Sequence, residues 1–195
     1  QRLAGYTVLT SAIHMLTPGQ LFIKRVFDIV LALIGSAITC IILPFIAIAI
    51  KSKSKGPIFF KQKRVGKNGE IFNMFKFRSM YNNAEEKKSA LLSKNEMCGS
   101  MMFKMENDPR IIPGIGHFIR KHSIDEFPQF FNVLIGNMSV VGTRPPTLDE
   151  WKKYLPNHRV RLSVKPGITG MWQVSGRNSV TDFEEIVKLD EKYLN

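Results

Sequence analysis

The sequence predicts an α+β protein: a re-entrant membrane hairpin of helix, break and helix, followed by a compact, mainly helical domain with a small β-hairpin or sheet. Three observations predict this fold. A run of 22 residues, Ile29 to Ile50, carries no charged side chain. An Asn-Gly pair separates two short apolar runs, which is typical of a β-hairpin. Ser or Thr followed three residues later by Glu recurs along the chain and marks helix starts.

The composition indicates which class of partner the protein would bind. The 195 residues carry a formal net charge of +12, which favours phosphates, nucleic acid or acidic lipid as partners. The two cysteines, Cys40 and Cys98, form no CxxC pair, so neither a zinc site nor a disulfide framework is expected. We expect a linker or the tail of a preceding domain over residues 1–20, the membrane hairpin over 21–55 and a second domain over 56–195.

The charge-free run is predicted to lie in a membrane. A helix over Ile29 to Ile50 would be about 33 Å long, enough to cross a hydrocarbon core. The run is too long for a signal peptide, and a chain of this size could not easily cover such a helix as a core element. Both flanks are basic, which favours the cytoplasmic side, and Pro44 must kink or break the helix. These features indicate a helix that returns to the face it entered from; a single span is the alternative.

Two strands joined by a tight turn are predicted next. Ile58 to Val65 and Glu70 to Arg78 flank Lys67-Asn68-Gly69. Because side chains alternate along a strand, Lys76 and Arg78 fall on one face of the second strand. Such a pair of cations either protects a solvated edge from aggregation or binds a phosphate.

A helix-like segment, Tyr81 to Met105, begins polar and ends rich in methionine. Its methionines either pack in a core or contact lipid, and the sequence leaves both alternatives open: Met97, Met101, Met102 and Met105. Arg120 then brings positive charge to the start of the next segment.

An acidic pair, Asp125-Glu126, stands before an apolar run that ends at Gly136. Ser123 has the spacing of a capping box with Glu126, so a helix is expected to begin here, and acids in its first turn suit the helix dipole. A short extended segment over residues 138–141 follows, and then Arg144 in a proline-rich turn.

The C-terminal third is predicted to contain two more capped helices. Thr147 with Glu150 and Thr181 with Glu184 form the capping boxes. Between them, Lys165 to Gly170 is expected to be an ordered turn that leads into a strand, Met171 to Val174. In the last helix Asp190 lies in the middle of an apolar stripe, where a carboxylate needs a cation or a metal. A buried pair with an arginine and a role in a site are both open alternatives.

Several motifs together resemble the bacterial sugar transferase family, whose members are monotopic phosphoglycosyl transferases. The resemblance begins at Lys24 and continues to the end of the chain, with these landmarks: Lys24-Arg25-Val26-Phe27-Asp28, Gly56-Pro57-Ile58-Phe59-Phe60, Gln62-Lys63-Arg64-Val65-Gly66, Lys76-Phe77-Arg78-Ser79-Met80, Asp125-Glu126-Phe127-Pro128-Gln129, Val141-Gly142-Thr143-Arg144-Pro145 and Lys165-Pro166-Gly167-Ile168-Thr169-Gly170. It implies a catalytic domain over residues 56–195. One departure is Leu43-Pro44 at the membrane break, where the family often has Ser-Pro.

The resemblance implies roles for individual residues. Asp125 would be the nucleophile and a ligand of Mg²⁺, and Glu126 the base that prepares the carrier phosphate. Lys76 and Asp190 match the family's lysine and its late helical aspartate. Cations for the phosphates would come from Arg78, Arg120, Arg144 and Lys165. The segment Gly170 to Asn178, with Gln173 and Arg177, is expected to face the nucleotide sugar.

The reaction implied is transfer of a hexose 1-phosphate from a UDP-hexose to polyprenyl phosphate at the cytoplasmic face of the bacterial inner membrane. Membrane lipid would be a further partner, and nucleic acid would not. A nucleic-acid-binding protein would explain the positive charge but not the apolar run. A basic membrane-surface scaffold would explain both, but not an acidic pair among cations. The sequence does not specify the sugar or the oligomeric state.

Overall fold

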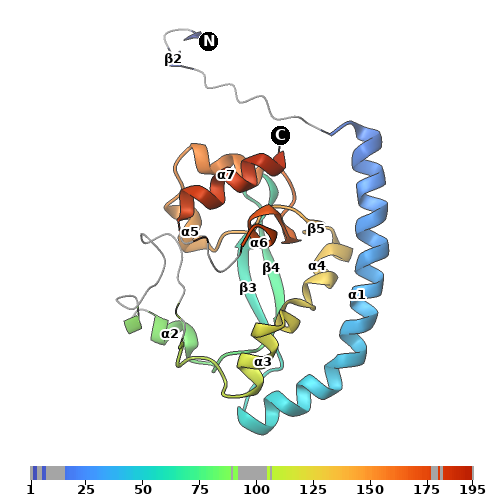
Figure 1. Ribbon diagram of the computed structural model, residues 1–195, viewed down its shortest axis with the longest axis vertical. Coiled ribbons are helices and arrows are strands. Elements are labelled where there is room, and N and C mark those ends of the chain that lie inside the picture. Colours follow the sequence, from blue (N-terminus) through green and yellow to red (C-terminus); the bar gives the residue numbers. More distant parts are fainter. Residues whose placement is uncertain are drawn as a thin grey trace.

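Helix α1 (Pro18–Lys53) forms one side of the molecule, and α3 (Ile115–Lys121), α4 (Gln129–Ile135) and β5 (Ser139–Val141) contact its inner face (Figure 1). The computed structural model describes residues 2–3, 6–7, 16–88, 90–91, 105, 107–176, 180 and 182–194. Before α1, the short strands β1 (Arg2–Leu3) and β2 (Tyr6–Thr7) pair with each other.

Helix α1 is longer than the charge-free run that predicted it. Thr17 and Gln20 form a capping box with Pro18 in the first turn, so the helix begins well before Ile29. Pro44 lies inside α1, and the second half of the helix turns toward the bottom of the domain (Figure 1). A proline removes one hydrogen bond of the helix and its ring clashes with the preceding turn. The bend fits the predicted helix-break-helix hairpin.

The two faces of α1 differ in chemistry. Its inner face is built from buried residues that are mostly small or polar: Asp28, Ala32, Gly35, Ser36, Thr39, Ile46 and Ile50. Its outer face exposes large apolar side chains such as Phe22, Phe45 and Ile48. Among the residues that the structure describes, α1 is the one helix long and apolar enough to cross a membrane. The inner face of α1 therefore packs against the rest of the protein, and the outer face is suited to contact with lipid.

The predicted β-hairpin is confirmed. Strands β3 (Phe59–Val65) and β4 (Ile71–Phe77) pair antiparallel around the 3₁₀ turn η1 (Lys67–Gly69). Asn68 and Gly69 have φ of 57° and 85°, the left-handed values that these two residue types tolerate best. The register sets Phe60 opposite Lys76, and the hairpin packs against α1 through Phe72 and Met74 of β4.

The acidic pair does not begin an α-helix, so the expected capping box at Ser123 is wrong. Ser123 has φ of 55° and its side chain caps nothing. Asp125 and Glu126 lie in the 3₁₀ turn η3 (Ile124–Glu126), and helix α4 (Gln129–Ile135) starts only after Pro128. Proline has no amide hydrogen to donate to Ile124 and would clash with its carbonyl, so a helix could not continue from Ser123 through this position. Helix α3 (Ile115–Lys121) precedes the turn.

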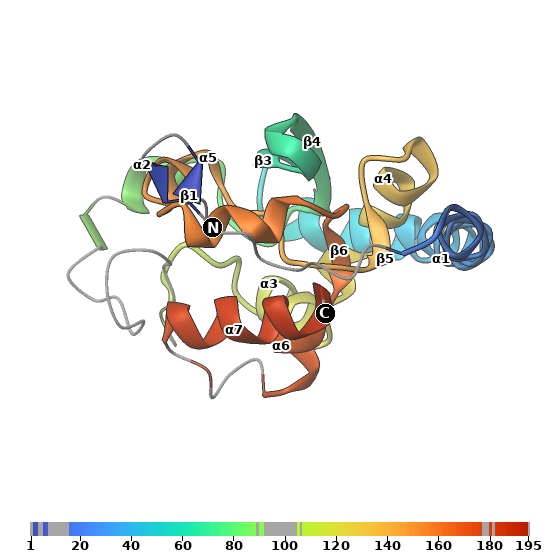
Figure 2. The same cartoon turned by 90° about the horizontal axis from the view of Figure 1, so that it is seen from above.

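A parallel pair of short strands replaces the turn and strand expected near Lys165. Strand β5 (Ser139–Val141) pairs with β6 (Gly167–Thr169), and residues Met171–Val174 form the helical turn α6 instead of a strand. Gly142 and Gly167 approach so closely that a side chain on either would overlap the other's backbone. Seen from above, these strands lie between the β-hairpin and α7 (Phe183–Leu194) (Figure 2).

The C-terminal helices pack as their patterns predict. Thr147 and Glu150 form the expected capping box of α5 (Leu148–Lys152), which is followed by the 3₁₀ helix η4 (Asn157–Leu162). The apolar stripe of α7 is buried, whereas Thr181, its expected cap, lies outside the described residues. A helix was expected over residues 81–105, and within this range the structure describes the short helix α2 (Ala84–Lys88). The other described residues of this range are 81–83, 90–91 and 105. Met97, Met101 and Met102 lie outside the described residues.

Candidate active site

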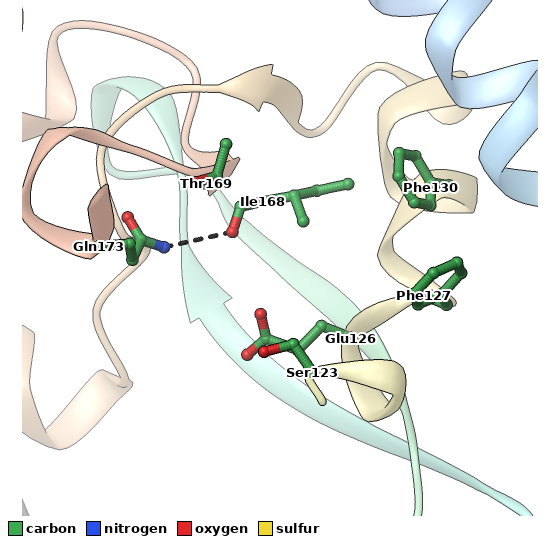
Figure 3. Close-up of a pocket in the computed structure, with 7 residues that line it drawn as sticks. All are labelled: Ser123, Glu126, Phe127, Phe130, Ile168, Thr169 and Gln173. Carbon is green, nitrogen blue, oxygen red and sulfur yellow. Dashed lines mark hydrogen bonds between the residues drawn. The ribbon is translucent and has the colours of Figure 1, made fainter. Parts of the chain in front are cut away.

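The acidic pair lies beside a cavity between η3, α4 and the β6–α6 segment. The cavity has a volume of about 240 Å³, and we call it the acid pocket; its lining residues are Ser123, Glu126, Phe127, Phe130, Ile168, Thr169 and Gln173. Glu126 and Ser123 point into it from one side, and Ile168 and Thr169 face them (Figure 3). Asp125, which directly precedes Glu126 in the chain, is not among the lining residues and is only 7% exposed.

Lys76 and Glu126, both predicted site residues, form an ion pair. Lys76 Nζ lies 2.9 Å from Glu126 Oε1, and both side chains remain about one-fifth exposed, at 20% and 19%. The contact joins β4 to η3 across 50 positions of sequence. Glu126 lines the acid pocket and both side chains are partly exposed, so a ligand in the pocket could reach the charged groups of the pair.

Two further arginines add positive charge near Glu126. Arg144 Nη1 lies 3.1 Å from Glu150 Oε2, and Arg64 Nη1 lies 3.7 Å from the same oxygen. Burial lowers the pKa of Arg64 to about 10, and the neighbouring Arg144 adds to this, whereas Glu150 and Glu126 oppose it. Burial also acts against Arg144, but Glu150, and Glu126 more weakly, raise its pKa above the ordinary value. Both guanidiniums therefore stay charged at neutral pH.

The sequence reasoning did not single out Arg64, although a signal for its position beside the predicted site residues was present. The register pairs Arg64 with Phe72 and Phe60 with Lys76, so Arg64 and Lys76 lie on the same face of the hairpin. Arg64 also donates to the Pro145 carbonyl, which ties the hairpin to the loop that carries Arg144. The predicted Asn-Gly turn fixes the register of the hairpin, and this register places Arg64 and Lys76 on one face.

The other predicted arginines lie elsewhere. Arg78 is buried beyond the end of β4, where it donates to Ser54 and Lys55 at the C-terminal end of α1. It therefore ties the β-hairpin to the end of α1. Arg120 is exposed at the end of α3. Burial acts to raise the pKa of Asp108, but its hydrogen bonds and ion pair with Arg110, and more weakly the charge of Arg120, lower it. Neither Arg78 nor Arg120 lines the acid pocket.

Asp190 has the geometry of the buried pair that the sequence left open. It is 0% exposed, and Arg161 Nε donates to its Oδ2 at 2.6 Å. Arg161 also donates to the Tyr154 hydroxyl. Burial raises the pKa of Asp190, and the charge of Arg161 opposes that shift. Asp190 does not line the acid pocket.

The remaining predicted residues are divided between two places. Gln173 lines the acid pocket and donates from Nε2 to the Ile168 carbonyl at 3.2 Å (Figure 3). Lys165 lies in a second cavity, at the turn of the β-hairpin. Arg177 lies outside the described residues.

The membrane helix contacts the acidic segment directly. The Phe130 ring packs so closely on Gly35 that a side chain at that position would overlap it. The Thr39 hydroxyl is 3.3 Å from the Phe127 carbonyl, and Arg25 donates to the Val133 and Leu134 carbonyls at the end of α4. These contacts fix α4, and with it one wall of the acid pocket, against α1.

Comparison with known proteins gives a family for most of the chain. The family model described as bacterial sugar transferase matches residues 19–195. A galactosyl transferase, CpsE, of Streptococcus agalactiae serotype III (strain NEM316) is 54% identical over 195 residues, which are 100% of this chain and 43% of that protein. The chain thus spans less than half the length of this relative.

Two further relatives carry the name of a reaction. An undecaprenyl-phosphate galactose phosphotransferase of Salmonella typhimurium is 42% identical over 89% of this chain and 36% of its own length. A UDP-glucose:undecaprenyl-phosphate glucose-1-phosphate transferase of Escherichia coli (strain K12) is 36% identical over 88% of this chain and 36% of its own length.

Proposed function

The chain belongs to the bacterial sugar transferase family, and from that premise we propose that it transfers a hexose 1-phosphate from a UDP-hexose to undecaprenyl phosphate. The names of the relatives support a nucleotide sugar as donor and a lipid phosphate as acceptor. The observation that carries the proposal is the Lys76–Glu126 pair, which sits next to Asp125 at the edge of an open pocket. An acid pair surrounded by cations is what transfer between two phosphates requires.

In the proposed first step, an Asp125 oxygen attacks the phosphorus nearest the sugar. The bond between this phosphorus and the bridging oxygen breaks, its electron pair stays on that oxygen, and UMP leaves. The sugar phosphate remains on Asp125 as an acyl phosphate, a type of intermediate known for carboxylate nucleophiles. Lys76, Arg64 and Arg144 would balance the phosphate charges, since a bare carboxylate would be repelled by the donor.

In the proposed second step, the phosphate of the lipid carrier attacks the same phosphorus and releases Asp125. Glu126 would take any proton from the incoming phosphate, which leaves the carrier oxygen as a better nucleophile. Lys76 would pass from Glu126 to the phosphate oxygens as the carrier arrives. The contacts between α1 and α4 support this order, because they hold the acid pocket next to the helix that is suited to lipid.

The proposal includes Mg²⁺ as a cofactor. No three His, Cys, Asp or Glu side chains come together as a metal cage in the part of the chain that the structure describes. Mg²⁺ is often held by one or two carboxylates together with substrate phosphates and water, so Asp125 with a bound diphosphate is a donor set that fits it. When bound, the ion would neutralise phosphate charge.

The test is release of UMP by the purified chain in lipid nanodiscs supplied with undecaprenyl phosphate, Mg²⁺ and one UDP-sugar at a time. Galactose is the first sugar to test, because the relatives at 54% and 42% identity carry it in their names. We expect UMP and a lipid-linked sugar product in equal amounts. Absence of UMP with UDP-galactose, UDP-glucose and their N-acetylated forms would contradict the proposal and favour a membrane-surface scaffold.

The division of labour between the two acids has its own test. Glu126→Gln is expected to release UMP once per enzyme molecule, to retain labelled sugar phosphate on the protein and to form little lipid product. Glu185→Gln, an exposed change on α7, is the matched control. If Glu126→Gln blocks labelling and transfer to the same degree, Glu126 does not act in the second step alone.

A further inference from the structure

A second cavity lies at the far end of the β-hairpin from the acidic pair. It has a volume of about 130 Å³ between the hairpin turn and the C-terminal end of α4, and we call it the hairpin pocket. Its polar side chains are mostly cationic or amide: Lys67, Asn68, Asn137 and Lys165, with Glu70 as the one carboxylate in its lining. None of these residues lines the acid pocket.

Positive charge gathers around the hairpin pocket. The Arg25 guanidinium and the Lys165 ammonium both lie within 4 Å of the place where a Cβ on Gly136 would sit. Burial lowers the pKa of Lys165, and the charges of Arg25 and Lys67 lower it further, more than Asp28 and Glu70 offset. Neither Lys67 nor Lys165 forms an ion pair with a described residue. An anion in this pocket would therefore relieve repulsion among its cations.

Exposed apolar side chains surround these cations. Ile71, which lines the hairpin pocket, is 57% exposed, and Ile135, beside Gly136, is 65% exposed. Phe22 and Val26, which flank Arg25 on α1, are also exposed and belong to the outer face of that helix. A cationic pocket with an apolar rim matches a molecule that has an anionic head and an apolar body.

We propose that the hairpin pocket binds the headgroup phosphate of an anionic phospholipid, with Lys67 and Lys165 on the phosphate and the isoleucine rim on the adjoining chains. Juxtamembrane lysines gain about 1 kcal/mol each from an anionic lipid surface. Such a contact would anchor the hairpin turn and the end of α4 to the bilayer surface, in addition to α1.

The bound lipid would be a structural partner and not the reacting carrier. Phe72 lines the hairpin pocket, whereas Lys76, four residues further along β4, contacts Glu126. At about 3.3 Å per residue, these positions are about 13 Å apart along the strand. A phosphate held by Lys165 is therefore too far from the acidic pair to react there. The proposal concerns binding alone, so it stands or falls separately from UMP release.

Native mass spectrometry of the purified chain in non-ionic detergent tests the proposal. The fraction of protein that retains one lipid is measured with dioleoyl phosphatidylglycerol, with dioleoyl phosphatidylcholine, and with phosphatidylglycerol in competition with inorganic phosphate. We expect retention of phosphatidylglycerol over phosphatidylcholine. The double variant Lys67→Gln/Lys165→Gln is expected to lower that retention about thirtyfold, which corresponds to the loss of two such lysines. Asn137→Asp, which adds a carboxylate to the lining, is expected to lower it as well.

The matched control is Lys152→Gln/Lys188→Gln, which removes the same charge from two exposed positions outside both cavities. It should retain phosphatidylglycerol like the unchanged chain. Equal loss in both double variants would show that net charge alone attracts the lipid and would overturn the site. Equal retention of the two lipids would overturn it too. Displacement of phosphatidylglycerol by an equal concentration of inorganic phosphate would assign the pocket to a free anion.

Discussion

Two ion pairs in this protein have the same chemistry and different surroundings. Lys76–Glu126 joins two elements at the edge of the acid pocket, with side chains 20% and 19% exposed. Arg161–Asp190 joins η4 to α7, with side chains 2% and 1% exposed. A pair that water reaches contributes little to stability and can exchange partners, whereas a sealed pair is costly to break. Burial, more than residue type, therefore distinguishes these two pairs.

The largest effect is expected at Asp125, the residue that precedes Glu126 of the exposed pair in the chain. Asp125→Asn removes the proposed nucleophile, and we expect turnover to fall about 10⁴-fold, because little can replace an attacking group. UMP release under saturating UDP-sugar measures the change, and the thermal unfolding midpoint should stay close to that of the unchanged chain. Asp149→Asn, an exposed change on α5, is the control. Residual activity within tenfold of the control would rule out Asp125 as the nucleophile.

Disruption of the buried Arg161–Asp190 pair should lower the stability of the fold. Asp190→Asn leaves the Arg161 charge buried without its carboxylate, and removal of one partner of such a pair costs about 3–5 kcal/mol. The double change Arg161→Met/Asp190→Leu should recover much of that loss, because it removes both charges. Thermal unfolding midpoints of these two variants and of the unchanged chain provide the measurement. If Asp190→Asn unfolds like the unchanged chain but loses turnover, the catalytic role implied by the family resemblance is correct and the structural one is not.

Local signals in the sequence predicted local structure well. The Asn68-Gly69 turn and the Thr147–Glu150 capping box were both confirmed, because each depends on residues within a few positions of one another. The apolar stripe of α7 was also confirmed, since helical period alone sets it. The acidic pair and Lys76 were predicted as site residues, and the structure brings Glu126 and Lys76 into contact.

The capping box at Ser123 failed for a local reason, Pro128, whereas the following features depend on distant parts of the chain. Residues 171–174 were expected as a strand, but β6 forms earlier because it pairs with β5, more than twenty positions away. The partner of Asp190 is one of many arginines, and only packing of η4 against α7 selects Arg161. The shared contact of Arg64 and Arg144 with Glu150 likewise joins a strand, a loop and a helix.

The Glu150 carboxylate, which pairs with Arg64 and Arg144, is intermediate in exposure between the two pairs. Its ion pairs should make the stability of the protein depend on pH. Although burial acts in the opposite direction, Arg144 and Arg64 hold the pKa of Glu150 at about 2, below its ordinary 4.5. A lowered acid pKa stabilises the fold above pH 4.5, and this contribution of about 3 kcal/mol is lost as pH falls from about 4.5 toward 2. Unfolding midpoints between pH 6 and pH 2.5 should fall less steeply for Glu150→Gln. Parallel curves would contradict this assignment.

The smallest effect among these tests is expected at Lys76, and it bears most directly on the comparison. Lys76→Met keeps the aliphatic stem of the side chain and removes its charge from the acid pocket. We expect turnover to fall about 100-fold, since one charge stabiliser of the transferred phosphate is lost. Stability should change by less than about 1 kcal/mol, because the pair is partly exposed. Lys63→Met, on the opposite face of the same hairpin, controls for lost charge. A stability loss as large as that of Asp190→Asn, with turnover per folded molecule unchanged, would make Lys76–Glu126 a structural pair as well, and exposure would no longer distinguish the two.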